Sequence, residues 1–168
     1  MSRSRAIAGT IVFFFLAPGT VAGLIPWWIT GWRDAGTLGQ PALWLGIVLI
    51  AAGLAVLIDC FARFALKGIG TPAPVAPTEK LVISGTYRFV RNPMYLAVLA
   101  IIAGQALIFG SWWLIAYGAT AWLVTHVFVI AYEEPALRRQ FPADYAAYAG
   151  AVGRWLPRPR PWRGEDGG

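Results

Sequence analysis

Four long runs of apolar residues constrain this chain more than any other feature of its sequence. They cover approximately residues 6–30, 41–64, 93–110 and 112–132 and contain almost no charged side chains. Each run is close to the roughly 20 residues that a helix needs to cross a bilayer. The sequence therefore predicts an all-α fold, a polytopic membrane helical bundle with about four transmembrane helices, in a single membrane domain over residues 1–168.

The composition agrees with a membrane protein. Hydrophobic residues make up 58% of the 168 residues and charged residues only 13%, whereas about a quarter of a soluble domain is charged. The first run is too long, and is followed by too much further membrane sequence, to be a cleaved signal peptide. Cys60 is the single cysteine, so no intrachain disulfide forms, and we interpret it as a small apolar filler.

Basic residues are distributed unevenly around the apolar runs. Only Arg33 lies on one side, beside Asp34, and all the others lie on the opposite side. Because cytoplasmic loops carry an excess of Lys and Arg, we expect a multi-pass protein of a bacterial inner membrane with both termini in the cytoplasm. The net charge of +6 then needs no nucleic-acid partner. The predicted cytoplasmic basic residues are Arg3, Arg5, Arg63, Lys67, Lys80, Arg88, Arg91, Arg138, Arg139, Arg154, Arg158, Arg160 and Arg163.

Several tryptophans gather near the ends of the runs that this orientation places outside. Amphipathic indole rings favour the headgroup level of a bilayer, so these residues support the same topology. They are Trp27, Trp28, Trp32, Trp44, Trp112 and Trp113.

The sequence GTYRFVRNPMYLAV, residues 85–98, lies where a polar loop meets the third run. Asparagine is a favoured N-cap and proline fits the first helical turn, so the third helix is predicted to begin at Pro93 with Asn92 as its cap. A helix N-terminus carries free N–H groups and a partial positive charge. Arg91, just outside it, adds a guanidinium that can bind a carboxylate through two hydrogen bonds. This helix end is therefore a candidate site for an anionic group.

The sequence AYEEPALRRQFPADYAAYAGAVGRWLPRP follows the fourth run from Ala131. Glu133 and Glu134 are predicted to end the fourth helix at the cytoplasmic membrane edge. Pro135 is expected to break or kink the chain there and to begin a new amphipathic cytoplasmic helix, interrupted at Pro142.

The third and fourth runs are separated by a very short connection around residues 110–111, which predicts an antiparallel hairpin. The cytoplasmic ends of the two helices should then lie side by side. We therefore expect Arg91, Asn92 and Tyr95 to face Glu133 and Glu134. Adjacent carboxylates at membrane depth are costly unless a cationic or hydrogen-bonding group satisfies them, so this arrangement predicts a binding site.

Each candidate residue also has a simpler interpretation. Basic residues that flank a span, such as Arg88 and Arg91, commonly serve only as topology signals. Glu134 and Arg138 have the i,i+4 spacing of an ion pair on a solvated helix face. His126, the single histidine, is compatible with packing or an interhelical hydrogen bond as well as with a substrate contact. The tyrosines that fit an aromatic belt are Tyr87, Tyr132, Tyr145 and Tyr148.

Together these segments resemble the membrane methyltransferases that include isoprenylcysteine carboxyl methyltransferase and the phospholipid N-methyltransferases. The pattern is G-x-Y-R-x-x-R-[HN]-P-x-Y, a helical hairpin, E-E-x-x-L, an aromatic residue, Y-x-x-Y and R-x-x-P. It covers about the last half of the chain, with Asn92 where many relatives have histidine and Ala97 where many have glycine. The matching residues are Gly85, Tyr87, Arg88, Arg91, Asn92, Pro93, Tyr95, Glu133, Glu134, Leu137, Phe141, Tyr145, Tyr148 and Arg154.

The resemblance implies an S-adenosylmethionine-dependent methyltransferase without the Rossmann domain of the soluble methyltransferases. It implies that segments 85–95 and 133–157 bind the cofactor at the cytoplasmic membrane face. The acceptor would be lipophilic, either a prenylcysteine-type carboxylate or a phospholipid amine.

The resemblance also implies roles for individual residues. Arg91 and Glu134 would be catalytic, with Glu134 as the base for an amine acceptor, and Arg154 would contact the substrate. His126 is a further candidate for a substrate contact by its position alone, about two helical turns before Glu133 in the fourth run. No metal is expected. The cofactor-binding residues would be Tyr87, Arg91, Asn92, Tyr95, Glu133, Glu134 and Tyr148.

Two other functions compete with the enzyme. A noncatalytic membrane scaffold or assembly factor would tolerate alanine at Glu133 and Glu134. A small transporter or channel subunit would carry ionisable residues near the middle of several spans, and only His126 approaches that position.

Overall fold

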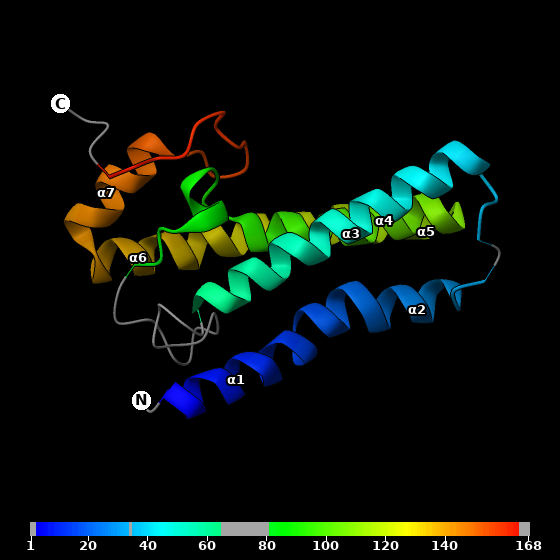
Figure 1. Ribbon diagram of the computed structural model, residues 1–168, viewed down its shortest axis with the longest axis horizontal. Coiled ribbons are helices and arrows are strands. Elements are labelled where there is room, and N and C mark those ends of the chain that lie inside the picture. The colour runs from blue at the N-terminus through cyan, green and yellow to red at the C-terminus, as the bar shows by residue number, and fades with distance from the viewer. Residues whose placement is uncertain (1–2, 34, 65–80, 165–168) are drawn as a thin grey trace.

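The computed structural model describes residues 3–33, 35–64 and 81–164, and the regular structure in these residues is helical throughout (Figure 1). The predicted all-α class is confirmed for this part of the chain. Lys67 and Lys80, two of the predicted cytoplasmic basic residues, and Asp34 lie outside the described residues. The helices are α1 (Arg3–Leu16), a π-helical turn (Thr20–Leu24), α2 (Ile25–Thr30), α3 (Gln40–Arg63), a 3-10 turn (Gly85–Arg88), α4 (Pro93–Phe109), α5 (Trp112–Phe128), a second π-helical turn (Val129–Glu133), α6 (Glu134–Gln140) and α7 (Pro142–Ala151).

Three helical stretches are long and apolar enough to cross a membrane. They are Ile11–Thr30, Gln40–Arg63 and Trp112–Gln140, so the structure supports a multi-pass membrane protein. α4 is equally apolar but has only 17 residues. At about 1.5 Å per residue such a helix is roughly 26 Å long, slightly shorter than the roughly 30 Å hydrocarbon core. The fourth crossing therefore stays a prediction.

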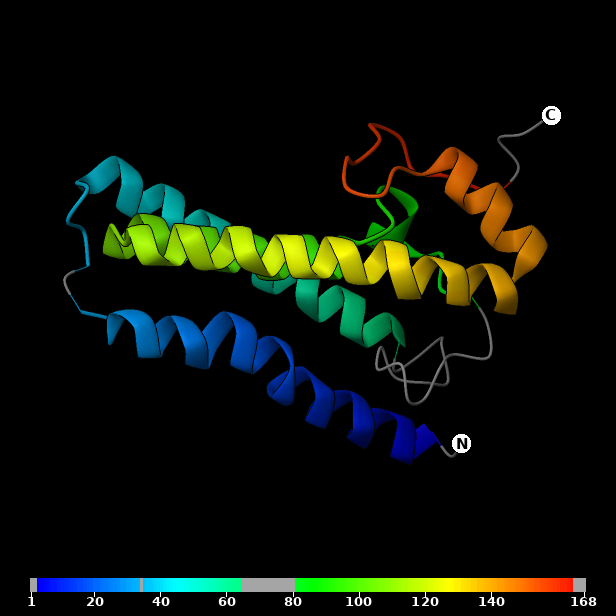
Figure 2. The ribbon, with the colours of Figure 1, turned by 180° about the vertical axis from the view of Figure 1, so that it is seen from behind.

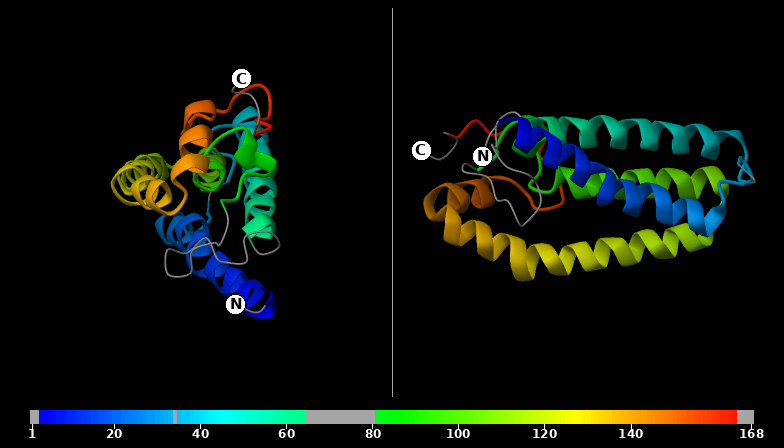
Figure 3. Two further views of the ribbon diagram at one scale, coloured as in Figure 1. Left: turned by 90° about the vertical axis from the view of Figure 1, so that its left-hand side faces the viewer. Right: turned by 90° about the horizontal axis from the view of Figure 1, so that it is seen from below.

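The long helices lie alongside one another. α3, α4 and the continuous helix formed by α5 and α6 run side by side, and α1 with α2 crosses them (Figures 1 and 3). α7 and the segment that follows it lie at the end of the bundle where α1 begins (Figure 2). α4 ends at Gly110, which has a left-handed conformation (φ 57°), and Ser111 caps α5. The predicted hairpin is thus present.

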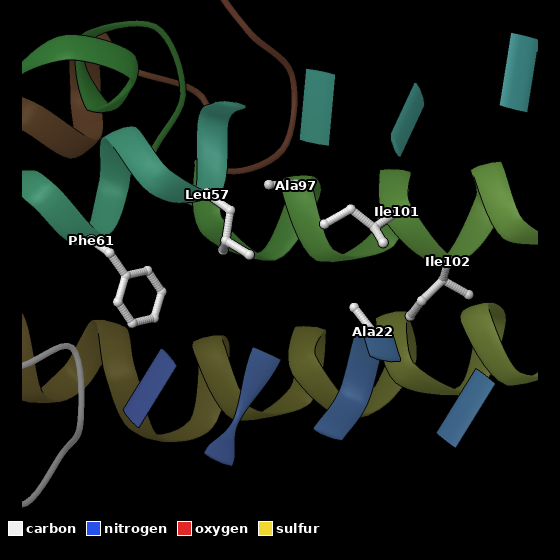
Figure 4. Packing of buried hydrophobic residues seen from close by; sticks show 6 residues of the cluster. All are labelled: Ala22, Leu57, Phe61, Ala97, Ile101 and Ile102. Carbon is white, nitrogen blue, oxygen red and sulfur yellow. The ribbon is translucent and has the colours of Figure 1, made fainter. Parts of the chain in front are cut away.

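α3 and α4 approach each other closely because small residues face each other. A Cβ atom on Gly46 would lie 2.6 Å from the carbonyl oxygen of Gly104, and one on Gly53 would lie 2.8 Å from the carbonyl oxygen of Ala97. Small residues allow helix backbones to pack tightly in membranes. Apolar side chains fill the remaining space between these helices and the first span (Figure 4), and the buried ones are Ala22, Leu57, Phe61, Ala97, Ile101 and Ile102.

In the first span the helical hydrogen-bond pattern is interrupted, and side chains of neighbouring helices bond the carbonyl oxygens that are left free. Pro26 has no N–H group, and the π-helical turn before it leaves nearby carbonyl oxygens without their usual partners. Gln105 Nε2 in α4 donates to the Ala22 oxygen at 2.7 Å, and Tyr117 Oη in α5 donates to the Val21 oxygen at 2.8 Å. These bonds matter because the bilayer core offers no water to unsatisfied backbone groups.

The outward-facing surface of the helices is apolar. Large aliphatic and aromatic side chains on α1, α2, α3, α5 and the connection after α2 are exposed, as expected for surfaces in contact with lipid. The predicted outer tryptophans are among them, with Trp28 81% and Trp112 75% exposed. The exposed set also includes Trp27, Trp32, Trp44 and Trp113.

Pro135 does not end the fourth helix, contrary to the prediction. The π-helical turn before it shifts the hydrogen-bond register, with Glu134 N–H donating to the Val129 oxygen. A proline is accommodated in the first turn after such a shift, where its missing N–H costs little. One helix therefore extends over Trp112–Gln140. The chain turns only at Phe141 (φ −133°, ψ 67°), before α7 begins.

Candidate functional site

The start of α4 is held by backbone geometry rather than by a side-chain cap. The 3-10 turn begins at Gly85, whose φ of 57° favours glycine, and it leads the chain into α4 at Pro93, as predicted. The predicted N-cap is wrong in one respect: the side chain of Asn92 does not cap the helix. Its Nδ2 donates to the Arg154 carbonyl oxygen at 3.1 Å, so Asn92 fastens the C-terminal part of the chain to this end of α4.

Glu134 is the centre of a buried charge cluster. The residue is 7% exposed, and its carboxylate accepts hydrogen bonds from Arg154 Nε on Oε1 at 2.5 Å and from Arg154 Nη2 on Oε2 at 3.0 Å. Arg91 Nη1 lies 3.2 Å from the same Oε1 and donates to Tyr145 Oη at 3.0 Å. The hydrogen bond with Glu134 raises the pKa of Arg154 further. The cluster therefore joins the ends of α4 and α6 to the C-terminal part of the chain.

Glu133 has a different environment from its neighbour. Its Oε2 accepts a hydrogen bond from Tyr95 Oη at 2.9 Å, and no ion pair to it is found in the described part of the chain. Tyr95 lies in the first turn of α4, and both side chains are half-buried. The inner ends of the two helices thus meet at two points, Tyr95–Glu133 and Arg91–Glu134. The structure brings together the residues that the sequence placed opposite each other.

The C-terminal segment (residues 153–162) returns from α7 and lies against the chain just before α4. In Figure 1 this red segment passes beside the green 3-10 turn. Its backbone is bonded at several positions, which makes it part of the site rather than a free tail. The bonds run from Arg91 N to Gly153 O (2.9 Å), Arg158 N to Phe89 O (2.9 Å), Trp162 N to Arg88 O (2.9 Å) and Arg88 Nε to Trp162 O (2.6 Å).

A cluster of aromatic residues supports this segment. Tyr145 and Tyr148 on α7 are buried at 2% and 3% exposure and pack with Trp162. Tyr148 Oη donates to the Tyr87 carbonyl oxygen at 2.6 Å. Burial raises the pKa of Tyr148 and of Tyr87, so both phenols stay protonated. Buried rings of this kind are unlike a headgroup belt, and of the four tyrosines considered for one only Tyr132 is strongly exposed, at 49%.

His126 is linked to the same segment. Its Nδ1 accepts a hydrogen bond from Trp155 Nε1 at 2.9 Å, and its ring stacks on Trp122 with centroids 5.0 Å apart. Trp155 also contacts the Tyr95 ring, with centroids 6.5 Å apart. His126 therefore bonds the C-terminal segment near the charge cluster, in place of the interhelical hydrogen bond considered from the sequence.

The structure decides the considered Glu134–Arg138 pair and contains one further ion pair in α3. Glu134 pairs with Arg91 and Arg154 and not with Arg138, which lies over the Tyr145 ring at 5.8 Å. Asp59 pairs with Arg63 one turn later in α3, at 2.7 Å.

One donor in the cluster has no partner. Arg91 Nε is buried and has no hydrogen-bond partner among the residues that the structure describes. Buried donors are costly when unsatisfied, so this atom points to an additional acceptor, such as a carboxylate. Glu133 can accept further hydrogen bonds on the side that Tyr95 leaves open. The site therefore offers a donor for an anion and an acceptor for a cation. No three His, Cys, Asp or Glu side chains of the described residues are grouped as metal ligands.

Sequence reasoning missed some of the partners in this site. It did not place Trp155 at all, and it did not foresee that Arg154 binds Glu134 or that Tyr145 binds Arg91. Tyr145 lies on α7, within the Y-x-x-Y pattern, but that pattern does not indicate its partner. Arg154 and Trp155 lie on the C-terminal segment, which returns to the start of α4 only after α7, so no local pattern indicates their contacts. Their position beside R-x-x-P was the one signal available.

A comparison of the sequence with protein families gives a match over a large part of the chain. A family model described as "Phospholipid methyltransferase" matches residues 41–144, more than half of the chain. The matched region runs from α3 into α7 and includes Arg91, Tyr95, Glu133 and Glu134, while Arg154 lies beyond it. No curated protein matches the chain.

Proposed function

The chain belongs to the phospholipid methyltransferase family, and from this premise we propose that it is an S-adenosylmethionine-dependent methyltransferase that acts on a lipophilic acceptor at the cytoplasmic membrane face. The proposal rests mainly on the contact between the start of α4 and the start of α6. There, Arg91 just before α4 contributes a guanidinium with an unsatisfied donor, and Glu133 just before α6 contributes a carboxylate that can accept further hydrogen bonds.

The residues present fit the two charges of the cofactor's methionine part. Arg91 Nε would bind the carboxylate, supported by the N-terminus of α4. Glu133 would bind the ammonium, held in place by its hydrogen bond from Tyr95. When bound, S-adenosylmethionine supplies an electrophilic methyl group on a sulfonium. The task of the protein is then to align the acceptor with this group and to exclude water.

The contacts favour Glu133 over Glu134 as the chemically active carboxylate. Glu134 is engaged by two guanidinium groups, and such a carboxylate is a poor proton acceptor. We therefore assign Glu134 to orienting Arg91 and Arg154, in place of the general base expected from the sequence. A carboxylate acceptor needs no base, whereas the amine of a phospholipid must lose a proton, and Glu133 is the candidate to receive it. The description of the matched family favours a phospholipid acceptor.

The aromatic residues support the site indirectly. Tyr148 and Tyr87 are buried and bonded to each other through Tyr148 Oη, so we assign them to holding the C-terminal segment in place. Tyr95 has the more exposed ring and lies beside Glu133, which suits it to contact the cofactor. Asn92 acts through the backbone of Arg154.

Equilibrium binding of S-adenosylmethionine to the detergent-purified chain tests the proposal. Glu133→Gln and Arg91→Ala should each weaken binding at least tenfold, because each removes a charged contact worth about 1.5–3 kcal/mol. Asp144→Asn and Arg139→Ala are matched controls, since both residues are exposed and near the site. Wild type that does not bind, or variants that bind as well as wild type, would refute the proposed site and favour a noncatalytic scaffold.

A further inference from the structure

His126 contacts the proposed site without belonging to its charge cluster. It precedes Glu133 by seven residues in the same long helix (Trp112–Gln140), on the side toward the membrane interior, and the π-helical turn Val129–Glu133 lies between them. On its other side the ring stacks on Trp122, which is 41% exposed on the apolar surface of α5. The imidazole thus lies between the charged residues and the surface that faces lipid.

The partner of His126 determines where its proton lies. The indole N–H of Trp155 can only donate, so His126 Nδ1 must accept with a lone pair. The imidazole is then neutral and carries its proton on Nε2. In the described part of the chain no hydrogen bond to Nε2 is found. This N–H is therefore a neutral donor with free capacity beside the lipid-facing surface.

Trp155 also connects His126 to Tyr95 and Glu133. Trp155 contacts the Tyr95 ring, and Tyr95 in turn bonds Glu133. The backbone at Trp155 is held in place because the preceding residue, Arg154, is bonded to Glu134. The position of the His126 donor is thus set by the residues that hold the charge cluster.

We propose that His126 orients the methyl acceptor, with its Nε2–H donating a hydrogen bond to an oxygen of the lipophilic substrate. Trp155 is a positioning residue that fixes the tautomer presenting this donor. The inference rests on the proposed function and deepens it. The oxygen recognised is a carboxylate or carbonyl oxygen of a prenylcysteine-type acceptor, or a phosphate or ester oxygen of a phospholipid. A neutral donor suits this depth, because a charged side chain would be costly there.

Methyl-transfer kinetics with labelled S-adenosylmethionine test the inference on two acceptors, N-acetyl-S-farnesylcysteine and dioleoyl phosphatidylethanolamine in detergent micelles. His126→Leu should raise the KM for the methylated acceptor about 3- to 10-fold, the loss of one neutral hydrogen bond, while kcat and cofactor affinity change less than twofold. His126→Gln, which keeps an amide N–H, should restore most of the loss. Trp155→Phe should raise the same KM by a smaller factor, and Trp113→Phe, the same change at an exposed outer tryptophan, should not.

Nitrogen NMR of histidine-labelled protein provides a readout without any acceptor, because the chain has a single histidine. Wild type should show one neutral imidazole with its proton on Nε2, and Trp155→Phe should show a mixture of tautomers. A protonated Nδ1 in wild type overturns the inference.

The outcomes separate this inference from the proposed function. Failure of wild type to bind S-adenosylmethionine refutes the proposed function and the inference with it. Binding without methylation of either acceptor overturns the inference on these substrates. Methylation that His126→Leu leaves unchanged overturns the inference alone.

Discussion

Arg154 shows how a residue outside the helices can organise a site within them. Its guanidinium binds both oxygens of Glu134, its carbonyl oxygen accepts from Asn92, and the next residue, Trp155, bonds His126. These contacts reach both α4 and the long helix formed by α5 and α6. A single side chain and its backbone therefore fix the spacing of the two helix ends on which the proposed cofactor site depends.

Arg154→Lys should lower both stability and activity. An ammonium makes one contact where the guanidinium makes two, which leaves the buried Glu134 carboxylate with a poorer partner, at a cost of about 1–2 kcal/mol. Thermal unfolding of the detergent-purified protein would measure this loss. Arg160→Lys, at an exposed position of the same segment, should not change the melting temperature. Equal melting temperatures for both variants would contradict a structural role for the Arg154–Glu134 pair.

At the scale of elements, proline and the two π-helical turns explain why the long helices differ from ideal ones. In the first span the carbonyl oxygens freed near Pro26 are satisfied by α4 and α5. In the last long helix, the turn before Pro135 contains Glu133 and leads directly into Glu134, the two carboxylates that contact residues at the start of α4. These irregular turns thus position polar contacts that regular helices would not make.

Gln105→Leu should destabilise the bundle. Gln105 is 6% exposed, donates to the Ala22 oxygen and accepts from Trp32 Nε1 at 3.0 Å. A leucine of similar size would leave a buried carbonyl oxygen without a partner, at a cost of about 1–3 kcal/mol. Denaturation of the variant in detergent, compared with Gln40→Leu at the exposed start of α3, would reveal the difference. Stability equal to that of the control would show that the first span does not depend on this bond.

At the scale of the whole molecule, the helices separate two chemically different ends. One end carries exposed tryptophans and the short connection at Gly110–Ser111, and the other carries the charge cluster, α7 and the C-terminal segment. The start of α1 lies at the second end (Figure 1). We propose that this second end faces the cytoplasm, since nearly all basic residues gather there.

Thiol labelling of intact bacterial cells would test the orientation. In a Cys60→Ala background, which removes the single and buried cysteine, Leu38→Cys should react with a membrane-impermeant reagent in intact cells. Arg160→Cys should react only after the cells are made permeable. Both positions are exposed in the structure. Labelling of Arg160→Cys in intact cells would reverse the proposed orientation.

The sequence by itself determined the helical class, where the long helices begin and the meeting of their inner tips, but not that the last long helix continues past Pro135 to Gln140. It could do so because apolar runs of membrane-spanning length, a proline at a helix start and a very short hairpin connection each act locally. The pattern R-N-P-x-Y followed by E-E also identified the family before any coordinates.

Only the tertiary structure decided how the charged residues are paired. Glu133 and Glu134 are adjacent and chemically identical in sequence, yet one accepts from a tyrosine and the other binds two arginines. The difference arises because the C-terminal segment returns past α7 and places Arg154 on one carboxylate and not on the other. Contacts between residues so distant along the chain depend on how every helix packs, and no local pattern of residues records them.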